Sequence, residues 1–99
     1  MAEWYWPRYA VKVEVVEIMG EGKCPGGIKV GDSWIWEWKV PEGMCSWLAY
    51  SIFPFFQALT FGGNIAWEKE EGTTRVCCID PRFPVVVKLE RAHAMTLPK

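Results

Sequence analysis

The sequence predicts an α+β fold, in which a small antiparallel sheet of about five strands carries one kinked apolar helix. Several short segments alternate apolar and polar residues, which is typical of half-buried strands, and turn residues separate them. One longer segment instead places apolar residues three and four apart, as a helix does. The expected order is strand, strand, helix, strand, strand, strand. We expect a single domain over residues 1–99, with 1–8 as an N-terminal extension and 9–94 as the core.

Two strands are expected before the helix. Residues 9–18 alternate, so that Val11 and Val13 share one face while Lys12 lies on the other. Residues 33–40 alternate in the same way, with tryptophans on one face and charged residues on the other. The glycine-rich segment 19–31 between them predicts a loop.

The predicted helix covers residues 45–61 and ends at the glycine pair 62–63. Pro54 lies inside it and predicts a kink or a break, because proline removes a hydrogen bond and crowds the preceding turn. The helix is apolar nearly all round, and a single sheet covers only one side of it. We therefore expect a homo-oligomer, with the alternative that terminal residues such as Trp4 and Trp6 fold over the helix. Proline and polar residues within the helix argue against a membrane span.

Three further strands are expected after the helix. Residues 65–69 and 73–79 resemble the two arms of a hairpin around the turn at 70–72. Asp80 and the proline that follows it predict a turn, and residues 84–94 predict the last strand.

Composition and charge exclude some classes of function. The 99 residues are 51% hydrophobic, include 7 Trp, and carry a net charge of −1 without a basic stripe, which argues against nucleic-acid binding. The N-terminus lacks the pattern of a signal peptide, so we expect a cytoplasmic protein with reduced thiols. The single Gln and single Asn favour a thermophilic source.

Cysteines mark the expected site. Cys24, Cys45 and Cys78 each lie where a turn meets a regular element, and Asp80 shares the strand parity of Cys78. Cys77 has the opposite parity and polar neighbours, so we expect it to point outward. Three thiolates with an oxygen ligand, such as Asp80, would complete a four-coordinate site for zinc or iron. Cys45 would also lie at the helix N-terminus, where free N–H groups favour a thiolate.

Two other interpretations remain open. The cysteines could be inert and buried in an assembly or interaction module, since free cysteine often acts as a small hydrophobe and no Cys-x-x-Cys pair occurs. Alternatively, Cys45 could serve a thiol redox or nucleophilic enzyme. His93 is the one histidine and is expected to be a solvated residue at a strand end. No phosphate loop, dinucleotide fingerprint or hydrolase elbow is present.

A set of spaced motifs runs through most of the chain. It comprises Cys24, Gly31-Asp32, Gly43-Met44-Cys45, Phe61-Gly62-Gly63 and Cys78-Ile79-Asp80. In these motifs the chain resembles a family of small prokaryotic proteins of about this length that has no assigned biochemical role. The resemblance implies that three of the four cysteines, Cys77 excepted, belong to the family pattern. The chain departs from that pattern at Ile28, where His is frequent, and at Ile79, where Pro is frequent.

Overall fold

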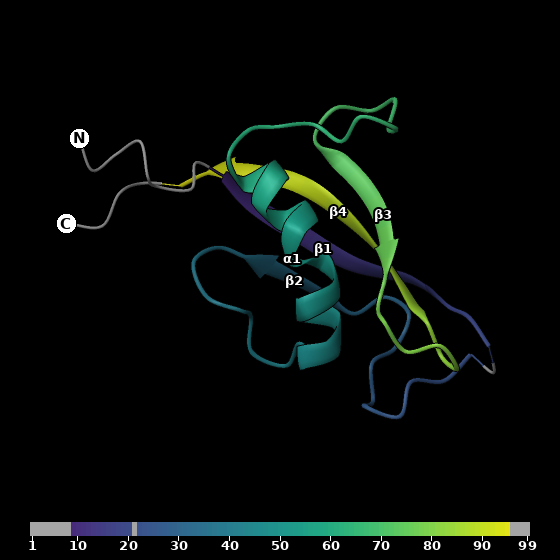
Figure 1. Ribbon diagram of the computed structural model, residues 1–99. Helices are drawn as coiled ribbons and strands as arrows, with labels where there is room; N and C mark the ends of the chain where they lie inside the picture. Colours follow the sequence, from purple (N-terminus) through teal and green to yellow (C-terminus); the bar gives the residue numbers. More distant parts are fainter. Residues whose placement is uncertain (1–8, 21, 96–99) are drawn as a thin grey trace.

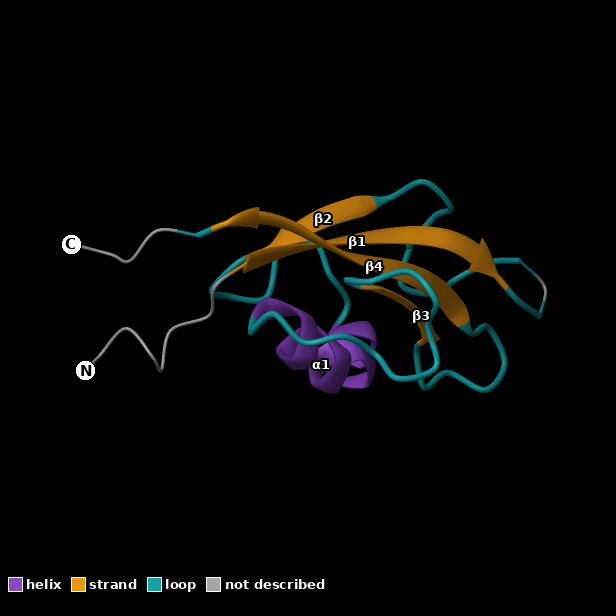
Figure 2. Cartoon of the chain, turned by 90° about the horizontal axis from the view of Figure 1, so that it is seen from above, coloured by secondary structure: helices purple, strands orange, loops and turns teal. Residues whose placement is uncertain are grey.

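The chain folds into two layers, a four-stranded antiparallel sheet and one helix. The computed structural model describes residues 9–20 and 22–95. Its elements are β1 (Tyr9–Ile18), β2 (Ser33–Trp36), α1 (Ser46–Thr60), β3 (Thr73–Cys77) and β4 (Val85–Ala94). Helix α1 packs on one face of the sheet (Figures 1 and 2), which confirms the α+β class. The expected extension 1–8, with its Trp4 and Trp6, lies outside the described residues.

Strands β1 and β4 form the centre of the sheet, whose order is β2-β1-β4-β3. Their inner faces meet in register, with Val13 opposite Leu89 and Val15 opposite Val87. All four side chains are at most 1% exposed, so the alternation read in the sequence does predict the buried face. On the outer face, opposite charges such as Lys12 and Glu90 lie across from each other, which favours this register.

Helix α1 covers the valine face of the sheet. Its buried residues follow the helical spacing, and they are Leu48, Ala49, Ile52, Phe56, Leu59 and Thr60. The ring of Phe56 stacks on Trp36 with centroids 4.2 Å apart. The helix runs from Ser46 to Thr60 with Pro54 inside it, so the break considered at Pro54 does not occur, and the kink stays a prediction.

The helix ends as its glycines predict. Gly62 has a φ of +89°, which L side chains rarely adopt, and its N–H donates to the carbonyl of Leu59. The N–H of Gly63 donates to the carbonyl of Ala58 at 2.8 Å, which completes a Schellman motif. This geometry gives the Phe-Gly-Gly segment a structural role.

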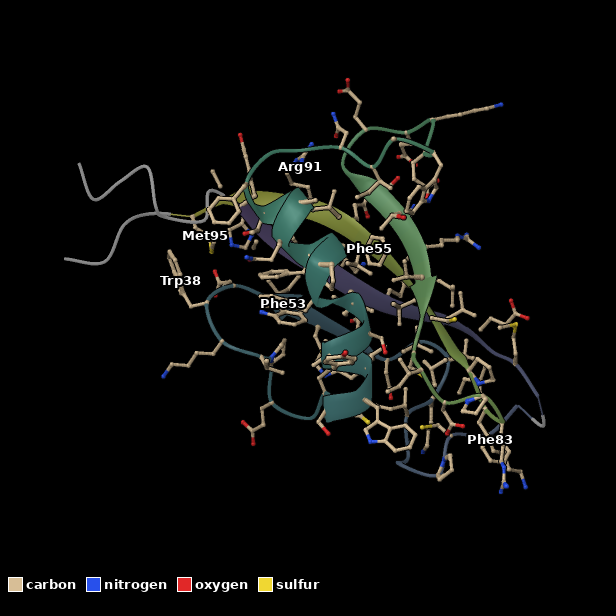
Figure 3. The ribbon with its side chains drawn as sticks, in the orientation of Figure 1. Trp38, Phe53, Phe55, Phe83, Arg91 and Met95 are labelled. Atoms are coloured by element: carbon tan, nitrogen blue, oxygen red, sulfur yellow. The ribbon has the colours of Figure 1, made fainter. Side chains whose placement is uncertain are left out.

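Arg91 of β4 joins the end of the helix to the sheet. Its guanidinium donates to the carbonyl oxygens of Leu59, at 3.1 Å, and Gly63, and also to the side-chain oxygen of Asn64 at 3.0 Å. It also lies over the ring of Tyr9, 5.5 Å from the centroid. Figure 3 shows Arg91 at this end of α1. The last turn of α1 has no basic residue, so Arg91 supplies the positive charge that a helix C-terminus favours.

The prediction of a strand at residues 65–69 is wrong. This segment turns back on itself, and the carboxylate of Glu68 accepts hydrogen bonds from the Thr74 hydroxyl at 2.9 Å and the Arg75 N–H at 3.1 Å. A side chain thus occupies a position on the edge of β3 that a hairpin partner would need. The described part of the chain consequently has four strands where about five were expected. Strand β2 also ends earlier than predicted, at Trp36.

Candidate functional site: a pocket lined by three thiols

The expected site residues come together in one pocket. A hollow of about 350 Å³ lies beside the first turn of α1. Its lining comprises Cys24, Pro25, Gly26, Cys45, Ser46, Trp47, Cys78 and Asp80. The three cysteines expected where turns meet regular elements, together with Asp80, therefore share a pocket although they come from three separate parts of the chain.

Cys45 occupies the N-cap position of α1. Its backbone is extended, with φ −62° and ψ 141°, and its carbonyl accepts the N–H of Ala49 at 2.9 Å. Its side chain makes no capping hydrogen bond, and no acidic residue lies in the first turn of the helix. The N–H groups of this turn therefore receive no hydrogen bond from a carboxylate of their own turn.

Cys78 lies just beyond β3, and it is the most buried of the four cysteines at 8% exposure. Its sulfur accepts the N–H of Val85 at 3.3 Å and lies 4.0 Å from the carbonyl oxygen of Phe83. The sulfur therefore lies between a backbone donor and a backbone acceptor, which fixes its position in the pocket.

Asp80 shapes the turn that carries Cys78 into the pocket. One oxygen, Oδ1, accepts the N–H of Arg82 at 2.9 Å and that of Phe83 at 3.3 Å. This bonding is an Asx turn, and it makes Asp80 part of the fold as well as a pocket residue. The carboxylate has a second oxygen, so a role as ligand stays compatible with the turn.

Cys24 enters the pocket from a tight turn. The N–H of Gly27 donates to the carbonyl of Cys24 at 3.0 Å, with Pro25 at the second position of the turn. A Cβ at Gly26 would lie 3.7 Å from the Cys24 sulfur, so the sulfur lies over the backbone of its own turn. The loop that carries Cys24 joins β1 to β2. A hydrogen bond from the N–H of Val15 to the carbonyl of Asp32, 2.8 Å long, holds the end of this loop next to β2.

The remaining candidate residues lie elsewhere. Cys77 is exposed, as predicted, and does not line the thiol pocket. His93 is also exposed, and its Nε2 lies 3.2 Å from a carboxylate oxygen of Glu37. Within residues 9–20 and 22–95, no group of three or more His, Cys, Asp or Glu side chains converges closely enough to hold a metal ion. The thiols therefore share the pocket without forming a ready coordination sphere.

A larger apolar groove runs along the exposed face of α1. Its volume is about 670 Å³, and its lining includes Trp36, Trp38, Val40, Tyr50, Phe53, Pro54, Cys77 and Ile79. Figure 3 shows Phe53 on the side of α1 that faces Trp38, whereas Phe55 points the other way. Tyr50 is 73% exposed and Phe53 is 46% exposed, so the side of the helix opposite the sheet is open, as its all-round apolar character predicts.

Sequence patterns missed two features of these surfaces. Trp47 forms part of the thiol pocket, although its helical position indicates only an outward face. Ile79 joins the apolar groove after β3 has ended, and its parity with Cys77 was the one available signal. Both contacts depend on how the helix and the turn after β3 pack, which local periodicity does not specify.

Comparisons with known proteins give no relative. No family model matches the chain, no curated protein matches its sequence, and no solved structure matches its fold. The resemblance to a small prokaryotic family consequently stays a prediction. Among the described residues, α1 is the one helix, and it lacks the length and apolar run needed to cross a membrane.

Proposed function

We propose that the chain is a thiol-site protein that binds zinc or iron through Cys24, Cys45 and Cys78. The observation that carries this proposal is that one pocket of about 350 Å³ is lined by all three thiols and by Asp80. Thiolates select soft or borderline metals, and a carboxylate oxygen is an accepted fourth ligand of zinc.

The surroundings of the sulfurs support this proposal. The Val85 N–H points at Cys78, and Cys45 lies at a helix N-terminus that has no acidic residue in its first turn. Both features place backbone N–H groups beside cysteines that would bind a metal through sulfur. Because the thiols do not converge, binding would draw the Cys24 turn and the Cys78 turn toward Cys45. Metal binding should therefore stabilise the fold by linkage.

Native mass spectrometry of the protein purified without oxygen is the direct test. Bound zinc would add the mass of a single ion, while an iron–sulfur unit would add iron and sulfide together. We expect one metal centre per chain, and we expect Cys45→Ser and Cys24→Ser to lose it.

Cys77→Ser is the matched control, because Cys77 is an exposed cysteine outside the pocket. It should keep the metal. The proposal fails if the reduced wild-type protein takes up neither zinc nor iron, or if Cys77→Ser loses metal as readily as Cys45→Ser. Rapid alkylation of Cys45 in a metal-free protein would favour the alternative of a thiol redox or nucleophilic enzyme. Slow alkylation there would favour inert cysteines in an assembly module.

The proposal includes a cytoplasmic location and a homo-oligomeric state. Reduced thiols persist in the cytoplasm, and a thiolate site needs them. The exposed aromatic face of α1 supports association of the chain, since soluble monomers rarely expose a large contiguous apolar surface.

A further inference from the structure

We infer that two copies of this chain associate through the exposed face of α1, and that this contact closes the mouth of the thiol pocket. The closing of the pocket rests on the proposed thiol site, whereas the association of two copies does not. The contact surface consists of the groove along α1, centred on Tyr50 and Phe53, together with Trp47 at the pocket end of the helix.

The residues of this surface follow one stripe of the helix. Trp47, Tyr50 and Phe53 are spaced three apart, so they lie on the same side of α1. Trp38 and Val40, which follow β2, form the wall beside them. The rings of Phe53 and Trp36 lie 6.3 Å apart, so the exposed stripe is continuous with the buried core.

The exposed area suits a second protein surface. Trp38, Trp47, Tyr50 and Phe53 are 42%, 53%, 73% and 46% exposed. Since an aromatic side chain carries roughly 200 Å² of surface, these four leave on the order of 400 Å² of ring surface in water. That is about half of what one partner contributes to a standard interface, before the aliphatic residues of the groove are added.

The chemistry of the surface favours a copy of itself. Helix α1 has no charged residue along Ser46–Thr60, and Glu37 is the one charged residue among the described residues that line the groove, so the surface is mainly apolar. Two-fold symmetry lets one apolar patch meet its own copy, with aromatic rings of one chain in the groove of the other. Aromatic residues near the centre of a contact contribute most of its binding energy.

Trp47 connects this surface to the thiol pocket. It is 53% exposed and also lines the pocket beside Cys45 and Cys78. A partner packed over Trp47 would exclude water from the pocket and slow the exchange of a bound ion. By linkage, metal binding and association would then strengthen each other.

The test measures mass against concentration by sedimentation velocity for the wild type, Tyr50→Glu and Trp67→Glu. Trp67 is a matched control, because it is 67% exposed and lies outside the groove. We expect a wild-type dimer, an association weakened at least tenfold in Tyr50→Glu, and a dimer retained in Trp67→Glu. Urea unfolding of each variant establishes that it is folded.

Cys77 supplies a second measurement that is independent of the thiol pocket, because it lines the groove. Its alkylation rate should fall as the wild-type concentration rises and should stay constant in folded Tyr50→Glu. A wild type that is monomeric at every concentration, or a dimer that Tyr50→Glu leaves intact, would overturn the inference. If the dimer forms but metal is not bound, the proposed function fails and the interface stands. If metal exchange is equally fast in monomer and dimer, the closing of the pocket is refuted.

Discussion

Replacement of Arg91 by methionine should destabilise the fold. We expect a larger effect than from a neutral substitution of any other exposed or half-buried charged residue that the structure describes. Methionine keeps most of the length and apolar volume of the side chain but removes the guanidinium. The variant thus loses the hydrogen bonds to the Leu59 and Gly63 carbonyls, the bond to Asn64, and the contact over the Tyr9 ring.

The structure sets the size of the effect. Hydrogen bonds to a charged group contribute about 1.5–3 kcal/mol each at most, and the charge at a helix C-terminus adds about 0.3–1 kcal/mol. Solvent offsets part of this, because Arg91, Gly63 and Asn64 are not buried and can bind water instead. The carbonyl of Leu59 also keeps the N–H of Gly62. We therefore expect a loss of about 2–3 kcal/mol in the free energy of unfolding, or about 10–20 °C in Tm for a domain of this size.

Urea unfolding followed by tryptophan fluorescence measures this loss. Arg75→Met is the matched control, since Arg75 is exposed on β3 and its backbone N–H makes the hydrogen bond to Glu68. The control should change stability by no more than about 0.5 kcal/mol. The loss of stability in Arg91→Lys should lie between those of the two methionine variants, because lysine keeps the charge but lacks the planar guanidinium. Equal stabilities of Arg91→Met and Arg75→Met would refute the role given to Arg91.

Other substitutions test single contacts, each by its urea midpoint. Thr60→Val should destabilise by about 1 kcal/mol, because the buried hydroxyl donates to the Tyr9 carbonyl at 2.6 Å; an unchanged midpoint would contradict this. Gly20→Ala should cost about 2 kcal/mol or more, since its φ is +74° and a Cβ would clash with the Arg82 carbonyl; a neutral result would show that the loop relaxes. Glu68→Ala should cost about 1–2 kcal/mol and raise light scattering on warming, because it uncovers the edge of β3; no change in scattering would count against that protection.

Hydrophobic periodicity correctly predicted the elements that bury one face of their own side chains. Strand β1 and helix α1 match their predicted ranges closely, because one face of each is buried against the core. Parity separated Cys78 from Cys77 for the same reason, since the two side chains of adjacent residues point to opposite faces.

Periodicity did not predict the structure of segments whose conformation depends on a tertiary contact. The alternation at 65–69 resembles a strand, but the carboxylate of Glu68 bonds the edge of β3 and replaces a backbone ladder. The shared thiol pocket was predicted by residue type and position, whereas its wall at Trp47 depends on the packing of α1 against the turn after β3. Local sequence does not specify such packing.

The pairing of β1 with β4 has a consequence for how the chain folds. These two strands form the centre of the sheet, yet they are the first and the last of the described strands. Contacts between such distant parts of a chain close a long loop and slow folding. A nascent chain can therefore form α1 early, but the sheet that covers its apolar side is not complete until β4 has been synthesised. Folding is then completed late, and α1 waits for its full cover while residues 61–94 are synthesised.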